Sequence, residues 1–159
     1  VSLYFNTARQ RALRMGAWNC CSKRVELPKD ATAPAFGFTN RYRLPGDFMR
    51  LICLIDASRD ATYEIESGYI LTDLDTPLKI KYVFDDTEVT RFDPLLTTVF
   101  AYSLATDINE ALSEDRGKSQ DLVKKAEYWF NRAAGVDGQE RPPQELKHTS
   151  WLSARRRRS

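Results

Sequence analysis

Few side chains in this sequence have the type and spacing that catalysis requires. The single histidine, His148, lies in a polar, proline-rich stretch where nothing holds a general base in place, so nucleophilic chemistry has no partner for its serine or cysteine. Glu64 and Glu66 stand two residues apart in strand-like sequence and share one face. Paired carboxylates can do acid–base work, but a solvated sheet face is the commoner explanation. We therefore expect no catalytic residue and no enzyme activity.

The three cysteines are Cys20, Cys21 and Cys53, too few and too irregularly spaced for a disulfide framework. Adjacent cysteines bridge each other only with strain, and no second cysteine pair or nearby histidine completes a metal site. We expect these cysteines to be small buried side chains. We also expect no metal and no cofactor.

A basic cluster lies near the beginning of the chain. Arg9, Arg11 and Arg14 fall together on a predicted helix, turned toward water or a partner. Such a face can contact phosphates, but most basic runs are solvated or pair with acidic neighbours. We treat these three arginines as a candidate interface face.

A second basic cluster closes the sequence and follows an aromatic and an aliphatic residue. It can bind phosphate with strongly salt-dependent affinity, or dock in an acidic groove with apolar anchors; a solvated end is the third alternative. The candidate docking residues are Trp151, Leu152, Arg155, Arg156, Arg157 and Arg158.

Length and composition fit one soluble domain. A chain of 159 residues can bury a core, and no apolar run approaches the roughly 20 residues that span a bilayer, so we expect no membrane partner. Residues 1–50 carry nine Lys/Arg against three Asp/Glu, residues 51–139 nine against seventeen, and residues 140–159 six against two. Basic ends and an acidic middle can meet copies of the chain or stacked partners through surfaces of opposite sign; uneven scatter explains the pattern equally well. Position 1 is valine inside helix-like sequence, so we expect native sequence to precede it.

Three helices are predicted, over residues 3–21, 93–112 and 119–134. The second organises the chain, because Asp93 is a good N-cap, Pro94 suits the first turn, and apolar residues follow at helical spacing. The third ends before Gly135 and should pack antiparallel to the second across a short loop.

The block between the helices, residues 23–84, is rich in strands. Residues 78–84 alternate apolar and other side chains as a half-buried strand requires. The apolar run 51–55 fits a strand buried on both faces, and Ser67-Gly68 fits a two-residue hairpin turn.

These elements predict an α+β fold: an antiparallel helical bundle with an inserted small, mostly antiparallel β-sheet and an extended C-terminal tail. We expect residues 1–139 to form a single α+β domain. Residues 140–159 are polar and proline-containing and cannot bury a core of their own, so they read as a docking tail.

Several short motifs follow one another along the chain. They are Trp18-Asn19, Leu27-Pro28, Tyr42-Arg43-Leu44-Pro45-Gly46-Asp47-Phe48-Met49-Arg50-Leu51, Tyr63-Glu64-Ile65-Glu66-Ser67-Gly68-Tyr69-Ile70, Ile80-Lys81-Tyr82-Val83, Phe92-Asp93-Pro94-Leu95-Leu96 and Ser150-Trp151-Leu152-Ser153-Ala154-Arg155. In this order and spacing they resemble the tail tubular protein A family of short-tailed phages, the head-to-tail adaptor or gatekeeper. Cys20-Cys21 departs from the family pattern, which has aromatic and small residues after Trp-Asn.

The resemblance implies a structural virion protein without catalysis. It implies an α+β subunit that assembles in the host cytoplasm into a ring, commonly dodecameric, at the head–tail interface. Such a ring lies between the portal protein and the tail nozzle protein, extends the channel through which the genomic DNA passes, and often helps seat tail fibres.

The alternative is a non-catalytic nucleic-acid-binding module that uses the basic N-terminal helix and the arginine-rich tail. Such a module would interleave aromatic and basic residues on one surface, whereas most aromatic residues here occupy core-like positions.

Overall fold

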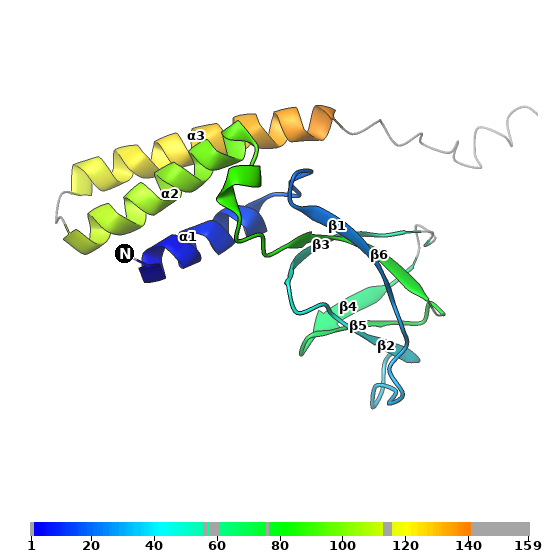
Figure 1. Cartoon of the computed structure of the whole chain (residues 1–159). Helices are drawn as coiled ribbons and strands as arrows, with labels where there is room; N and C mark the ends of the chain where they lie inside the picture. The colour runs from blue at the N-terminus through cyan, green and yellow to red at the C-terminus, as the bar shows by residue number, and fades with distance from the viewer. Residues whose placement is uncertain (1, 56, 58–60, 76, 113–115, 141–159) are drawn as a thin grey trace, which may run out of the picture.

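The structure is a computed structural model that describes residues 2–55, 57, 61–75, 77–112 and 116–140 (Figure 1). Residues 141–159 of the candidate docking tail, with His148 and Trp151 to Arg158, lie outside this part of the chain. The elements in chain order are α1 (Ser2–Met15), β1 (Ser22–Leu27), β2 (Asn40–Arg43), β3 (Phe48–Leu54), β4 (Tyr63–Glu66), β5 (Tyr69–Thr72), β6 (Leu78–Phe84), the 3-10 helix η1 (Val89–Arg91), α2 (Pro94–Leu112) and α3 (Arg116–Gln139).

The strands form two three-stranded antiparallel sheets. One has the order β1-β6-β3 and the other the order β2-β5-β4. The β4–β5 hairpin closes through Ser67 and Gly68, whose φ angles of 48° and 81° are those of a two-residue turn with both central residues left-handed. The predicted hairpin is confirmed.

Strand β6 separates two apolar cores. Leu78, Ile80 and Tyr82 point to one face and pack with residues of the second sheet, such as Tyr42 and Ile70. On the opposite face Val83 packs among the helices, in a cluster whose other buried members are Ala8, Ala12, Leu13, Trp18, Cys21, Phe92, Leu96, Val99, Phe100 and Ala133. The alternation predicted for residues 78–84 is therefore confirmed.

The helices form a layer beside the sheets rather than a bundle. Helix α2 packs against both α1 and α3, and α3 runs back along α2 in the antiparallel sense that the short connection predicts (Figure 1). Asp93 caps α2, because its Oδ1 accepts a hydrogen bond from the Leu95 backbone N–H at 2.8 Å.

The fold is α+β, but the predicted architecture, a helical bundle with one inserted sheet, is wrong. The six strands divide into two sheets that enclose a core of their own. The short helix α1 buries its apolar face partly against α2 and partly against Met49, Ile52 and Val83 of the first sheet, so sheet residues fill the space that a further helix would occupy in a bundle.

Two predicted helix ends are also wrong. The first helix ends at Met15 rather than at residue 21, because Trp18 folds back and its Nε1 donates a hydrogen bond to the Ala12 carbonyl at 2.8 Å. The third helix continues past Gly135 to Gln139. Its last turns are held by Asn19, whose backbone N–H donates to Asp137 Oδ1 at 2.7 Å. Strand β3 is half-buried along most of its length rather than buried on both faces.

Candidate functional site

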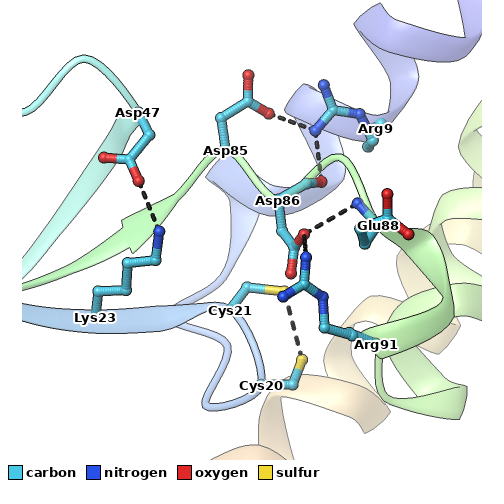
Figure 2. A network of polar contacts seen from close by, with 9 residues as sticks. All are labelled: Arg9, Cys20, Cys21, Lys23, Asp47, Asp85, Asp86, Glu88 and Arg91. Carbon is cyan, nitrogen blue, oxygen red and sulfur yellow. Dashed lines mark hydrogen bonds and ion pairs between the residues drawn. The ribbon is translucent and has the colours of Figure 1, made fainter.

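Arg9 is the most buried of the three arginines predicted on α1. Only 3% of the residue is exposed, and its guanidinium forms an ion pair with Asp85 (Figure 2). The same Nη1 donates a hydrogen bond to the Asp86 backbone carbonyl at 2.6 Å. Arg9 therefore ties α1 to the end of β6 and is not available on an exposed basic face.

Arg11 and Arg14 lie nearer the surface. Arg11 Nη1 is 2.8 Å from Asp107 Oδ1 on α2, with half of the Arg11 side chain exposed. Arg14 Nη1 donates to the Met49 carbonyl at 3.1 Å. Each of the three arginines thus has a different internal partner. The prediction that Arg9 turns toward water or a partner is wrong, because Arg9 is buried, whereas for Arg11 and Arg14 the interface face stays a prediction.

Asp86 is a buried carboxylate that sequence reasoning missed. It is 2% exposed, and its Oδ1 accepts hydrogen bonds from the Glu88 backbone N–H at 3.0 Å and from Arg91 Nη2 at 3.1 Å (Figure 2). Its Oδ2 has no hydrogen-bond partner among the described residues. The adjacent acids Asp85-Asp86 just after a strand were the only sequence signal. They do not show that the Asp86 carboxylate is buried, nor that Asp85 pairs with Arg9, which lies 76 residues away.

These contacts fix the passage from β6 through η1 to α2. Buried carboxylates are costly unless cations and N–H groups compensate them, and Arg91 and the Glu88 backbone N–H do so for the Asp86 carboxylate. Arg9 instead pairs with the Asp85 carboxylate and donates to the Asp86 backbone carbonyl. Together these contacts connect α1, the end of β6 and η1.

The adjacent cysteines differ in exposure. Cys20 is exposed and Cys21 is buried, so the expectation of small buried side chains is wrong for Cys20. Their sulfur atoms lie 3.6 Å apart (Figure 2). A hydrogen bond from Cys21 lowers the pKa of Cys20 to about 7, and the same bond together with burial raises the pKa of Cys21. Within the described residues no group of three His, Cys, Asp or Glu side chains is arranged to hold a metal ion.

Glu64 and Glu66 lie on one face of β4, as predicted, and both are exposed. They line a groove of about 620 Å³ between the outer face of the second sheet and residues 33–38. Arg41 lies in the same groove, 4.7 Å from the Tyr69 ring centre, and its Nη2 is 3.1 Å from Asp30 Oδ1. The two glutamates face open solvent rather than an enclosed site.

Exposed apolar side chains mark the remaining surfaces. Phe36 is 88% exposed at the rim of the groove. Leu112, Val123, Tyr128 and Val136 are exposed on α2 and α3. None of the helices in the described ranges is long and apolar enough to cross a membrane.

The sequence matches no known protein family and no curated protein.

Proposed function

We propose that this chain is the subunit of a structural ring, a head-to-tail adaptor that lies between the portal protein and the tail nozzle of a phage virion. One observation carries the proposal. Three of the motifs on which the family resemblance rests lie at junctions of the fold: Trp18-Asn19 between α1 and β1, Phe92-Asp93-Pro94 where α2 begins after β6 and η1, and Leu44-Pro45-Gly46-Asp47 between β2 and β3, which are in different sheets.

The Trp18-Asn19 motif joins the helices to the first sheet. Trp18 is buried, and its ring meets that of Phe130 on α3 edge-on, with centroids 6.1 Å apart. The Asn19 side chain donates to the Asp137 carbonyl at 3.0 Å. These contacts fix the helical hairpin at one angle to the strands.

The Leu-Pro-Gly-Asp motif joins β2 to β3. Asp47 Oδ1 accepts a hydrogen bond from the Tyr82 hydroxyl at 2.9 Å, and Asp47 Oδ2 lies 2.9 Å from Lys23 Nζ (Figure 2). One carboxylate thereby holds the turn against both β6 and β1. The Phe-Asp-Pro motif supplies the cap of α2 through Asp93.

The shape of the subunit suits an adaptor with separate contacts at its two ends. At 1.5 Å per residue, the 24 residues of α3 extend about 36 Å. This hairpin lies to one side of the sheets (Figure 1). Its exposed apolar residues offer contacts to a neighbouring copy, and the sheets offer a second surface to the portal, the nozzle or a tail fibre. The basic and acidic parts of the sequence favour head-to-tail contacts that close into a ring around the genomic DNA.

The test is the mass of the full chain by sedimentation velocity, alone and after mixing with the portal protein of the same virus. The proposal expects a complex of fixed stoichiometry, with a ring of this chain on each portal. A chain that stays separate from the portal at micromolar concentrations overturns the proposal.

The same samples test the nucleic-acid-binding alternative. Arg9 and Arg11 already pair with carboxylates inside the subunit, which leaves fewer free cations for phosphates. A nucleic-acid module would bind duplex DNA with a steep salt dependence and would lose affinity when residues 155–158 are removed. The adaptor would instead lose portal docking on that deletion, with its fold unchanged.

A further inference from the structure

Within the described part of the chain, strand β4 is an open edge of the second sheet. It pairs with β5 on one side only, and among the described residues no other strand pairs with it. The opposite edge of the same sheet is covered, because Lys29 bridges to Tyr42 of β2 and the Asp30 backbone N–H donates to the Arg41 carbonyl at 2.9 Å. All four β4 residues are exposed, and β4 has none of the lysines or prolines that usually protect an edge.

The hairpin geometry shows which β4 backbone groups point outward. In a two-residue hairpin the flanking residues, here Glu66 and Tyr69, exchange hydrogen bonds, and such pairs alternate with non-bonded pairs. Glu64 therefore bonds to β5 as well. The N–H and C=O groups of Tyr63 and Ile65 point away from β5 and can accept a further strand.

The two faces of this edge differ in chemistry. Ile65 lies opposite Ile70, which is fully buried, so Ile65 and Tyr63 are on the core side of the sheet. Each nevertheless remains 44% exposed. Glu64 and Glu66 are on the other side, facing the groove. An added strand would cover apolar side chains on one face and meet two carboxylates on the other.

The carboxylates of Glu64 and Glu66 indicate which kind of strand can pair with β4. Pairing with β4 of a second copy would place glutamates opposite glutamates on one face, which is unfavourable. We propose that β4 binds, by strand addition, an extended segment of a partner protein that alternates basic and apolar residues. The basic side chains would lie opposite Glu64 and Glu66, and the apolar ones would cover Tyr63 and Ile65. This proposal does not depend on the adaptor function.

The probe is a fluorescent eight-residue peptide that alternates lysine and valine, titrated with the full chain and followed by anisotropy. The matched peptide that alternates glutamate and valine should bind at least about tenfold more weakly. A third peptide has the lysine–valine sequence with its valine N–H groups methylated, because in an antiparallel pair the valines would lie opposite Tyr63 and Ile65 and exchange hydrogen bonds with them. This peptide keeps the charge but cannot pair along the edge of β4, so its affinity for the full chain should also be about tenfold weaker. Equal binding of the parent and methylated peptides would show attraction to charge alone and would overturn the proposal.

Variants of the protein locate the site. Ile65→Pro removes an outward N–H group but none of the hydrogen bonds between β4 and β5, so the affinity for the lysine–valine peptide should fall about tenfold. Ile65→Thr keeps that N–H group and should bind the peptide with nearly the wild-type affinity. The double variant Glu64→Lys/Glu66→Lys should reverse the preference in favour of the glutamate–valine peptide. An unchanged preference in that variant contradicts the assignment, even where Ile65→Pro fails to fold.

Discussion

Replacing Gly16 with alanine tests how the chain leaves α1. A Cβ atom at position 16 would lie 2.5 Å from Cε2 and 2.7 Å from Cζ2 of Trp18. Non-bonded carbon atoms pack at roughly 3.5–4.0 Å, so the indole ring would have to move by about 1 Å. The ring has little room, because it is buried against Phe130 and its Nε1 donates to the Ala12 carbonyl.

The expected cost follows from these contacts. Overpacking a filled core costs roughly 1–3 kcal/mol, and disturbing the indole hydrogen bond adds about 1 kcal/mol. The free energy of unfolding of Gly16→Ala should therefore fall by about 2–4 kcal/mol. With a urea m-value of about 2 kcal/mol/M, the unfolding midpoint would move down by about 1–2 M, measured by far-ultraviolet circular dichroism.

A matched control separates packing from backbone effects. Gly135 lies inside α3 with no atom within 4 Å of an added Cβ, so Gly135→Ala should stabilise the protein by about 0.5–1 kcal/mol. In a Trp18→Leu background, Gly16→Ala should lose most of its cost. A Gly16→Ala variant with the wild-type midpoint, or an undiminished cost in that background, would refute the steric argument.

Three further predictions concern a cap, a thiol and a carboxylate. Asp93→Ala should lower the free energy of unfolding by about 1 kcal/mol in thermal melts, and Asp93→Ser should restore most of it. Alkylation of Cys20 by iodoacetamide, followed by peptide mass spectrometry, should accelerate as the pH rises through about 7, and Cys21→Ala should move that rise toward pH 9.0. Burial alone would raise the pKa of Asp47, but the hydrogen bonds that it accepts, one from Lys23, hold its pKa below 3.8. Since a lowered folded-state pKa gives stability that is lost as the pH falls, Asp47→Asn should make the urea midpoint less dependent on pH below 3.8.

Sequence patterns correctly predicted those elements that depend on contacts between residues close together in the chain. The alternation in residues 78–84 specifies a strand with two different faces, and Ser67-Gly68 specifies its hairpin, whatever lies around them. Asp93-Pro94 likewise marks the beginning of α2 through a hydrogen bond within three residues. Such signals need no knowledge of distant partners.

The errors arose where distant contacts decide the outcome. Residues 16–21 have helical apolar spacing, but the burial of Trp18 against α3 outweighs that preference. The sequence places Arg9 on a solvated basic face, but in the structure Asp85 and the Asp86 carbonyl, at the end of β6, bind its guanidinium. The division of six strands into two sheets was also not predictable, because spacing along one chain does not show which strands pair.

The position of β6 has a consequence for how the protein unfolds. Because each face of this strand carries a different core, an opening that exposes one core also removes support from the other. We expect both to unfold in one cooperative step, with the β6 amide protons among the slowest to exchange with solvent. Its partners β1 and β3 come from earlier, separate parts of the chain, so the strand pairs that complete both cores require long loops to close. We therefore expect β6 to form its strand pairs late in folding and to lose their protection only when the whole domain unfolds.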